Sequence, residues 1–283
     1  MAATRPGRRR WRRVRRSTST MIGGAIVLLV ILSALLAPVV APDDPEAMEM
    51  TLRLAEPSRD HVMGTDQFGR DLFSRVLYGA RISLTVALVA VGVSLVIGVA
   101  VGLVSGYYGG LFDLIVQRLV DIFLAFPVLL LAIALIAALG SSPRNVILAL
   151  GLVNWTAYTR VVRVDVMALK HREFVQSARL VGASDARILL RHILPSVLSP
   201  VIVLATLGLG TAIVAESALS FLGLGVQPPR PSWGWTVAFG TRFLRDAPHL
   251  STFPGLAIMI SVMGFNLLGD GLRDLMDPRS RRR

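Results

Sequence analysis

EFVQSARLVGASDARILLRHILP, residues 173–195, is a polar and basic segment inside a chain that is otherwise strongly apolar. Connections that only return a chain across a bilayer are commonly short, whereas this segment is long enough for two helices. Gly182 stands between them, where a residue in the left-handed conformation ends a helix. Ser184 is suited to cap the second helix, and Asp185 in its first turn suits the helix dipole. The pattern predicts a helix, a tight turn and a second helix before Pro195, and together these form a docking surface.

Apolar residues recur at helical spacing in both predicted helices. They are Phe174, Val175, Ala178 and Val181 in the first helix, and Ile188, Leu189 and Ile193 in the second. This spacing supports the prediction of two helices.

The composition is that of a membrane protein. The chain has 283 residues, of which 53% are hydrophobic and 17% charged, and its mean hydropathy is +0.63. Ordinary soluble domains are less apolar and more charged. We expect an all-α, polytopic protein of the cell (inner) membrane. Cysteine is absent, which excludes disulfides and cysteine-ligated metal sites.

About six transmembrane helices are expected from stretches near the 20 apolar residues that cross a bilayer core. Their expected ranges are 21–40, 82–104, 112–139, 146–164, 197–222 and 254–268. In the third stretch Asp113, Arg118 and Asp121 precede the most apolar part, and we place these charges in a cytoplasmic turn. The chain then divides into a basic N-terminal tail (1–20), the first span (21–40), an external loop with an amphipathic segment (41–81), a transmembrane core (82–275) and a basic C-terminal tail (276–283).

Basic residues predict the orientation. The first sixteen residues carry eight arginines, seven further basic residues lie between 160 and 191, and five follow from Arg273 onward. Both termini and the 173–195 segment are therefore expected in the cytoplasm. The N-terminal run would also suit a cleavable signal or a nucleic-acid site. Because a long span follows it directly, we favour an uncleaved anchor and expect no nucleic-acid partner.

Two regions are expected to lie at the external surface. Residues 66–81 place Phe68 and Arg75 at helical spacing, which predicts an amphipathic helix along the outer membrane surface that receives a partner protein. Further along the chain, Trp233 and Trp235 are expected to be interfacial anchors. Closure of an external gate is the alternative role for these tryptophans.

Polar side chains within spans normally face a cavity or another helix, because exposure to lipid is costly. Glu216 is the clearest case, and the small residues that precede it permit close helix packing. We expect a hydrogen-bonding lock between helices near the outside, in preference to a proton-coupling carboxylate. Asn154 and Asn266 are further candidates for lining a pathway or joining helices.

No catalytic, cofactor or metal site is expected in this chain. A phosphate-binding loop needs lysine before serine or threonine, and the only lysine is Lys170, between Leu169 and His171. The four histidines are scattered and lack the usual spacing of metal ligands. They are His61, His171, His192 and His249.

Several short motifs carry a resemblance to a known family. In the 173–195 segment the motif residues are Gln176-Ser177-Ala178, Gly182 and Ile193-Leu194-Pro195. They resemble the cytoplasmic loop of permease subunits in ATP-binding-cassette (ABC) importers. Other motifs are Gly64-Thr65-Asp66, Gly69-Arg70-Asp71, Ser74-Arg75, Tyr78-Gly79-Ala80-Arg81, ESALSFLGLG from Glu216 and GDGLRD from Gly269. From about Ser17 to the C-terminus, the chain resembles the second permease of dipeptide, oligopeptide and nickel importers.

This resemblance implies an ATP-driven permease that forms half of a transmembrane pathway for short peptides. The implied partners are a second homologous permease, two ATP-binding subunits that hold ATP and magnesium, and an extracytoplasmic substrate-binding protein. ATP hydrolysis is expected in the separate subunits, so the chain itself is not expected to be an enzyme. The residues that it implies for ATPase coupling are Glu173, Gln176, Ser177, Ala178, Gly182, Ala183, Ser184, Asp185, Arg187, His192, Leu194 and Pro195.

Other solutes and other classes of protein remain as alternatives. Nickel chelates, glutathione-like molecules and longer peptides are alternative solutes, and no residue decides among them. An ion-coupled carrier would use Glu216 as its coupling site and show internal repeats or interrupted helices. A membrane-embedded enzyme would show converging catalytic side chains. Neither pattern is evident in the sequence.

Overall fold

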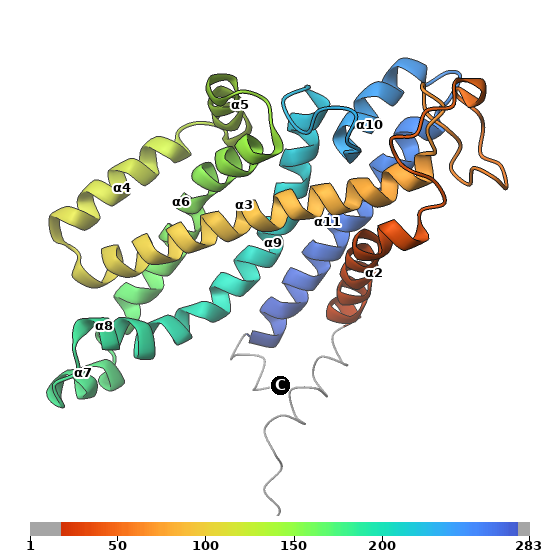
Figure 1. Cartoon of the computed structure of the whole chain (residues 1–283). Helices are drawn as coiled ribbons and strands as arrows, with labels where there is room; N and C mark the ends of the chain where they lie inside the picture. The colour runs from red at the N-terminus through yellow and green to blue at the C-terminus, as the bar shows by residue number, and fades with distance from the viewer. Residues whose placement is uncertain (1–17, 277–283) are drawn as a thin grey trace, which may run out of the picture.

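A computed structural model describes residues 18–276, so most of the two basic tails lies outside the described residues. The described chain is a bundle of helices (Figure 1). The longer helices are α2 (Thr18–Val40), α3 (Leu72–Tyr108), α4 (Gly110–Leu124), α5 (Val128–Leu139), α6 (Pro143–Leu169), α9 (Leu194–Phe221) and α11 (His249–Met276). The shorter ones are η1 (Met50–Leu52), α7 (Glu173–Leu180), α8 (Asp185–Arg187), the π-helix η2 (Ile188–Ile193), α10 (Trp233–Gly240) and η3 (Thr241–Phe243). The all-α fold class is confirmed.

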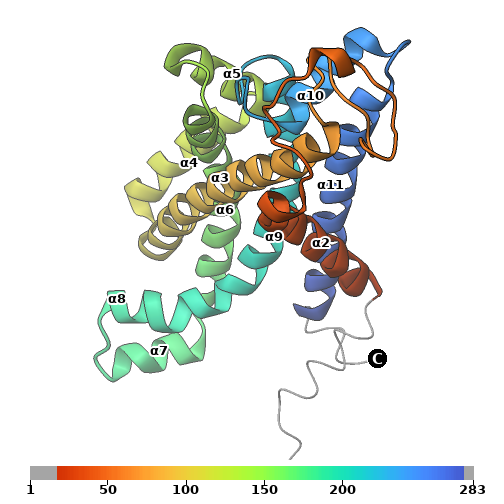
Figure 2. The same cartoon turned by 45° about the vertical axis from the view of Figure 1, so that its right-hand side comes forward.

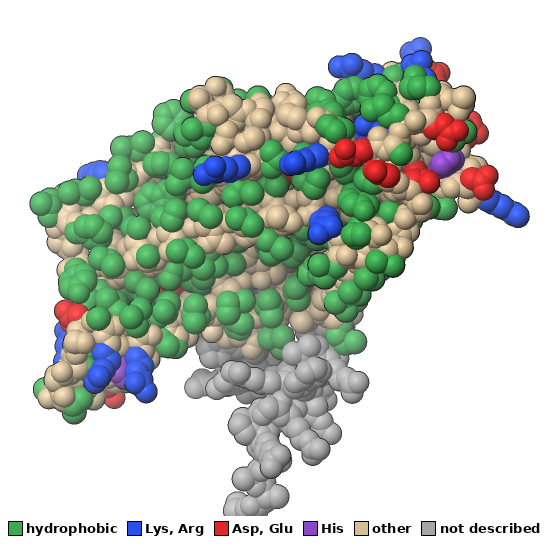
Figure 3. Space-filling view, viewed as in Figure 1, with side chains coloured by type: hydrophobic (Ala, Val, Ile, Leu, Met, Phe, Trp, Pro, Cys, Tyr) green, Lys and Arg blue, Asp and Glu red, His purple; other side chains and the backbone are tan. Residues whose placement is uncertain are grey.

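The bundle has two distinct ends. The start of α2 and the end of α11 lie at the same end as α7 and α8, whereas α5, α10 and the 41–71 loop lie at the other end (Figures 1 and 2). Hydrophobic side chains cover much of the face between the ends, and acidic side chains gather at the 41–71 loop (Figure 3). An apolar belt between two polar ends suits the hydrocarbon core of a bilayer.

Four helices among the described residues are long and apolar enough to cross a membrane. They are Thr18–Val40, Leu72–Tyr108, Asp185–Phe221 and His249–Met276. The pair α4 and α5 makes a fifth if it is counted as one span. Helix α6 is long enough, but Arg160, Arg163 and Asp165 lie in its second half. The expected count of six spans therefore stays a prediction.

Helix α3 differs from the sequence-based expectation. The sequence predicts a separate amphipathic helix over residues 66–81, but the structure has one continuous helix, Leu72–Tyr108. Asp71 caps this helix by accepting a hydrogen bond from Ser74 N at 2.7 Å. No proline interrupts the chain between the amphipathic part and the apolar part, so both follow one helix axis. Phe68 lies in the loop ahead of the helix.

The expected third span, residues 112–139, is broken. Helices α4 and α5 meet at an angle of 92°. Pro127 lies at the break, and a proline disfavours helical backbone at the residue before it. The three charges that we expected in a cytoplasmic turn lie within α4 instead. They are Asp113, Arg118 and Asp121.

The second helix of the 173–195 segment does not end at Pro195. Helix α8, the π-helix η2 and α9 form one continuous helix, Asp185–Phe221. Pro195 lies in the first turn of α9, directly after the π-helical turns. In an α-helix a proline ring clashes with the carbonyl four residues earlier, and the π-helical spacing moves this carbonyl out of the α-helical register. The helix therefore continues through the proline.

Glycines bring α3 and α6 close together. Gly98, Gly102 and Gly106 recur every four residues on the face of α3 that contacts α6. A Cβ atom at Gly102 would lie 2.8 Å from Thr159 O, so only glycine permits this approach. The packing fixes the last turn of α3 beside the 173–195 segment.

Candidate functional site

The candidate site is the α7–α8 hairpin, which we define as residues 173–195. Its turn is built around Gly182, whose φ of +79° lies in the left-handed region. Gly182 N donates to Arg179 O at 2.9 Å, and Ala183 N donates to Ala178 O at 3.0 Å. This pair of hydrogen bonds is a Schellman motif, in which a left-handed glycine closes a helix.

The second half of the hairpin begins at a side-chain cap. Ser184 Oγ accepts a hydrogen bond from Arg187 N at 3.4 Å, and Asp185 follows in the first turn. The predicted helix, glycine turn and capped second helix are therefore confirmed.

Apolar side chains attach the hairpin to the bundle. Val175, Ile188 and Ile193 are fully buried. The bundle contributes apolar side chains from α3 and α6 to the same cluster, namely Val99, Leu103, Tyr107, Val162 and Val166. Burying one large aliphatic side chain stabilises a fold by roughly 1.5–3 kcal/mol. The base of the hairpin is therefore a firmly packed part of the protein.

The tip of the hairpin carries exposed apolar side chains. Leu180 is 88% exposed and Val181 is 84% exposed. Helical spacing groups Val181 with Val175, but α7 ends at Leu180, so Val181 points away from the buried face. The sequence-based expectations also omit Leu180. An exposed apolar pair on a firmly packed base is suited to contact another protein.

Most of the residues expected to couple to an ATPase lie on the surface of the hairpin. The exposed ones are Glu173, Gln176, Ser177, Gly182, Ser184, Asp185, Arg187 and Pro195. Ala183, His192 and Leu194 are partly buried. Ala178 is only 8% exposed and packs toward the bundle, so its side chain serves the base of the hairpin.

Polar contacts join the hairpin to the end of α3. The Tyr107 hydroxyl donates to Asp185 Oδ1 at 2.6 Å and accepts from Arg179 Nη2 at 3.0 Å. The second hydrogen bond raises the pKa of the Arg179 guanidinium above its ordinary value. Lys170 Nζ donates to Gly106 O at 3.0 Å. Sequence reasoning missed Tyr107 and Lys170, because these contacts join residues 78 and 64 positions apart.

A second polar cluster lies near the same end of the bundle. Arg163 on α6 donates to both carboxylate oxygens of Asp113 on α4, at 2.5 and 2.6 Å. The Ser105 hydroxyl on α3 donates to the same carboxylate. Two-point pairing of this kind is strong and directional. The cluster therefore holds α4 against α3 and α6.

Glu216 lies in a different part of the molecule and is fully buried. Its carboxylate accepts hydrogen bonds from the hydroxyls of Ser83 at 2.8 Å, Ser220 at 2.8 Å and Ser232 at 3.4 Å. Ser83 belongs to α3, and Ser232 caps α10. The carboxylate thus joins α9, α3 and the start of α10. This geometry suits the expected helix lock, whose role stays a prediction.

The other two polar candidates are placed differently. Asn154 Nδ2 donates to Leu150 O within its own helix, at 2.9 Å. Asn266 borders an open groove of about 480 Å³ with Val214 and Asp270. The structure therefore does not gather Asn154, Asn266 and Glu216 into one hydrogen-bonded site among the described residues.

Buried charges hold the 41–71 loop onto the start of α3. Asp66 pairs with Arg70 at 2.7 Å and with Arg75 at 3.4 Å, and all three side chains are at most 3% exposed. Arg75 Nη1 also donates to Pro45 O at 2.7 Å. The motif residues of this loop therefore form an internal ion network, and they are not available to a partner protein.

His61 lies beside two carboxylates, although sequence spacing does not show this grouping. His61 Nδ1 is 3.1 Å from Asp71 Oδ1 and 3.9 Å from Asp43 Oδ2. One side-chain atom from each of Asp43, His61 and Asp71 could serve as a metal ligand, and these three atoms all lie within 4.8 Å of one another. Because Asp71 also caps α3, the contact with His61 closes the loop over the helix start.

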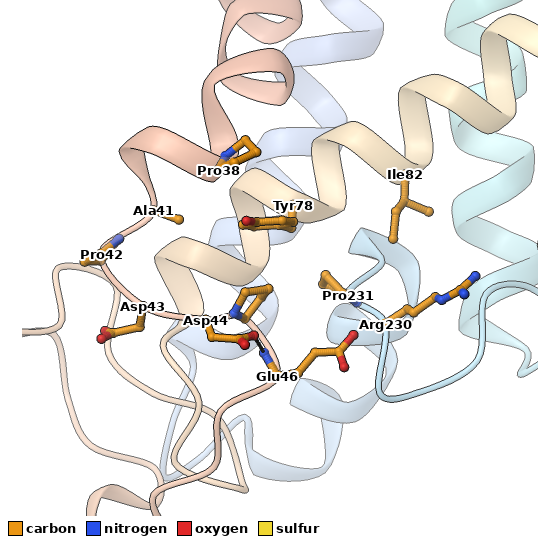
Figure 4. Close-up of a pocket in the computed structure, with 11 residues that line it drawn as sticks. Pro38, Ala41, Pro42, Asp43, Asp44, Glu46, Tyr78, Ile82, Arg230 and Pro231 are labelled. Carbon is orange, nitrogen blue, oxygen red and sulfur yellow. Dashed lines mark hydrogen bonds between the residues drawn. The ribbon is translucent and has the colours of Figure 1, made fainter.

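A pocket of about 600 Å³ opens between the end of α2, the start of α3 and the loop before α10 (Figure 4). Asp43, Asp44 and Glu46 line it together with Arg230. Asp44 Oδ1 accepts a hydrogen bond from Glu46 N at 2.8 Å, which is the dashed line in Figure 4. These four charged residues are all exposed, so the pocket has the character of a solvated loop surface.

The two tryptophans at the start of α10, Trp233 and Trp235, are not equivalent. Trp233 is 2% exposed, and its Nε1 donates to Val76 O at 2.8 Å. It packs directly against Gly79 of α3. The expected role of Trp233 as an interfacial anchor is therefore wrong, since its ring lies inside the protein. Trp235 is partly exposed and packs against Phe239, with ring centroids 4.9 Å apart.

Comparison with protein families gives two matches. Residues 98–282 match the family described as binding-protein-dependent transport system inner membrane component. Residues 5–57 match the N-terminal transmembrane domain of oligopeptide transport permease C. Together the two matched ranges cover most of the chain and include the α7–α8 hairpin.

Individual relatives are similar over nearly their whole length. The chain is 44% identical to the dipeptide transport system permease protein DppC of Alkalihalophilus pseudofirmus, covering 98% of this chain and 91% of that protein. It is 46% identical to the glutathione transport system permease protein GsiD of Escherichia coli, covering 95% and 89%. A chain of the inward-facing MetNI methionine ABC transporter superposes with a TM-score of 0.58 at 19% identity, covering 72% of this chain and 97% of that chain. This last likeness concerns the fold alone.

Proposed function

The chain belongs to the family of binding-protein-dependent transport system inner membrane components, and we propose that it forms half of the membrane pathway of an ABC importer for short peptides. It is a multi-pass membrane permease and not itself a catalytic enzyme. The other half of the pathway is a second, related permease. Two ATP-binding subunits supply the energy, and an external binding protein delivers the solute.

The observation that carries this proposal is the build of the α7–α8 hairpin. Its base is packed into the bundle through Val175 and Ile188, and its tip exposes Leu180 and Val181. A firmly held surface that exposes apolar side chains at its tip suits contact with a protein partner. The basic residues that the sequence carries in its two tails and between 160 and 191 favour a cytoplasmic hairpin, so we place the partner in the cytoplasm, where ATP is available.

The continuous helix Asp185–Phe221 supports a mechanism for coupling. When the two ATP-binding subunits close on ATP, they move the hairpin as a rigid body. The second half of the hairpin is the first part of the helix that crosses the bundle, so this movement tilts α9 directly. Tilting α9 and its neighbours opens the pathway to the outside, and relaxation after hydrolysis returns it to the inside.

The relatives support the choice of solute. One is named as a dipeptide permease and another as a glutathione permease. Glutathione is a short peptide, so both names agree on solutes of two or three residues. We therefore assign short peptides to this chain, and nickel chelates are the alternative.

Reconstitution of the complex tests the function. In proteoliposomes with the partner permease, both ATP-binding subunits and the binding protein, ATP should drive uptake of labelled di- or tripeptides. The purified chain alone should neither hydrolyse ATP nor accumulate peptide, because it has no lysine in a nucleotide-binding loop.

The alternatives give different results in the same assay. Uptake driven by a proton or sodium gradient with the chain alone would contradict the proposal and favour an ion-coupled carrier. ATP-driven uptake of a nickel chelate without uptake of peptides would keep the permease role and replace the solute class.

Cysteine labelling tests the orientation. Ser58→Cys in the 41–71 loop and His171→Cys, two residues before the hairpin, are both at exposed positions in a chain without native cysteine. In right-side-out membrane vesicles, an impermeant maleimide should label only Ser58→Cys. Both variants should react after the vesicles are permeabilised. Labelling of His171→Cys in intact vesicles would place the hairpin on the side without ATP and contradict the proposed coupling.

A further inference from the structure

We propose that Tyr107 is the positioning residue that links the α7–α8 hairpin to α3, so that movement of the hairpin reaches α3 as well as α9. This inference rests on the proposed function, because it assumes that an ATP-binding subunit moves the hairpin. It adds a residue outside the hairpin to the coupling machinery. The contacts that carry this role are the hydrogen bonds of the Tyr107 hydroxyl with Asp185 and Arg179.

The hydroxyl of Tyr107 contacts both halves of the hairpin. It accepts from Arg179 on α7 and donates to Asp185 on α8, so one oxygen atom bridges the two sides of the Gly182 turn. Both partners are charged, and hydrogen bonds with a charged partner are roughly twice as strong as neutral ones. The Arg179 guanidinium also lies over the Tyr107 ring, 5.3 Å from its centroid.

The tip of the hairpin has little else to hold it. A Cβ atom built at Gly182 meets no heavy atom within 4 Å among the described residues. The buried apolar contacts of the hairpin come from its base, at Val175 and Ile188. The bridge through Tyr107 is therefore the side-chain contact that ties both sides of the Gly182 turn to the end of α3.

Tyr107 itself is held in place. Its side chain is 6% exposed, and its ring packs edge-on against Tyr108 with centroids 5.2 Å apart. Lys170 Nζ donates to Gly106 O at 3.0 Å and to Tyr107 O at 3.4 Å. Because backbone and ring are both fixed, a shift of Asp185 or Arg179 must either break the bridge or move the end of α3.

Helix α3 connects this bridge to the buried carboxylate at Glu216. The same helix carries Ser83, whose hydroxyl donates to Glu216 on α9. Movement of the hairpin therefore has two routes to Glu216. One runs along the continuous helix that begins at Asp185, and the other runs through Tyr107 and α3.

The test uses the full reconstituted complex and Tyr107→Phe, which removes only the hydroxyl. Tyr108→Phe is the matched control, because Tyr108 is adjacent and 58% exposed. Four quantities are measured on the same samples: the amount of permease, the ATP-binding subunits that co-purify, the rate of ATP hydrolysis, and the peptide transported per ATP hydrolysed. We expect Tyr107→Phe to keep the first three within about twofold and to lower transport per ATP by at least about tenfold, since the loss of even one hydrogen bond with a charged group corresponds to about that factor and the hydroxyl makes two. Tyr108→Phe should match the wild type.

A second variant keeps the test decisive. Asp185→Ala removes the same hydrogen bond from its exposed partner, and the double variant Tyr107→Phe/Asp185→Ala should transport no less per ATP than the worse single variant. Additive losses would show that the two residues act separately and would overturn the proposal. If Tyr107→Phe does not accumulate in the membrane, the peptide transported per ATP hydrolysed is measured for Asp185→Ala instead.

Other outcomes also decide the question. Normal transport per ATP in Tyr107→Phe, at normal or reduced amounts of complex, would mean that the hydroxyl has at most a structural role, and the proposal would fail. Failure of the wild-type chain to bind ATP-binding subunits would instead contradict the proposed function, whatever the Tyr107 variants do.

Discussion

Replacing Gly182 by valine is expected to abolish solute uptake while the protein still accumulates in the membrane. The φ of +79° at Gly182 costs an L-residue with a Cβ atom roughly 1–2 kcal/mol, and more when the side chain is β-branched. No heavy atom of the described residues lies within 4 Å of the added Cβ, so the expected effect comes from the backbone conformation. To relieve the strain, the turn must break the hydrogen bonds of the Schellman motif and redirect α8. The exposed tip at Leu180 then no longer meets the ATP-binding subunit.

Three measurements on the same membranes check this result: the amount of permease, the co-purification of ATP-binding subunits, and peptide uptake. We expect the first to be near the wild-type level and the other two to fall by at least about tenfold, which corresponds to 1.4 kcal/mol. Gly182→Asn is the first control, because asparagine tolerates the left-handed region and should keep most activity. Gly92→Val makes the same substitution at an exposed helical glycine of α3 with open space around it, and it should have little effect. Normal uptake by Gly182→Val at equal expression would mean that the hairpin is only a solvated connection.

Replacing Glu216 by alanine is expected to destabilise the whole bundle. The substitution leaves the hydroxyls of Ser83, Ser220 and Ser232 without their buried acceptor. One unsatisfied buried polar group costs about 1–3 kcal/mol, and the space left by the side chain adds to this cost. We expect a total loss of about 3 kcal/mol, seen as a lower midpoint of thermal unfolding in detergent and a smaller amount of protein in the membrane.

The isosteric variant separates the two roles considered for this carboxylate. Glu216→Gln keeps an oxygen acceptor for the serine hydroxyls, so it should retain most stability and ATP-driven uptake. A proton-coupling carboxylate gives the opposite pattern. If Glu216→Gln were as stable as the wild type but transported nothing, the lock would be the wrong description and a coupling role for Glu216 would be favoured.

The features that sequence reasoning predicted well are those determined by neighbouring residues. The Gly182 turn and the Ser184 cap depend on residues within one helical turn, so their pattern is visible in the sequence. The break at Pro127 was missed, although proline is a local signal, because the apolar residues continue on both sides of it. The sequence pattern also fails to predict the full length of α3, because the composition changes from amphipathic to apolar while the helix continues.

Contacts between distant segments could not be predicted in this way. Trp233 is of a residue type that is common at membrane interfaces. Only its contact with Val76 of α3, 157 positions away in the sequence, shows that it is buried. The sequence shows only that Lys170 lies outside a nucleotide-binding loop. In the structure its ammonium group donates a hydrogen bond to Gly106 O near the end of α3. The sequence indicates that Glu216 is a polar residue within an apolar stretch, but two of the three hydroxyls that surround it, those of Ser83 and Ser232, come from other segments of the chain.

Two polar side-chain contacts join helix α3 to the long helix Asp185–Phe221, in addition to the apolar packing between the two helices. Tyr107 and Ser83 lie about 36 Å apart along α3, and their hydrogen-bond partners Asp185 and Glu216 lie about 45 Å apart along the other helix. Two contacts this far apart hold the two helices at a fixed angle as long as both contacts are intact. The contact at Tyr107 depends on a single hydroxyl and an exposed Asp185. The buried carboxylate of Glu216 instead accepts hydrogen bonds from three hydroxyls. A substitution at Tyr107 can therefore weaken the contact at the hairpin without disturbing the buried contact at Glu216, so variants there should change coupling before they change the stability of the bundle.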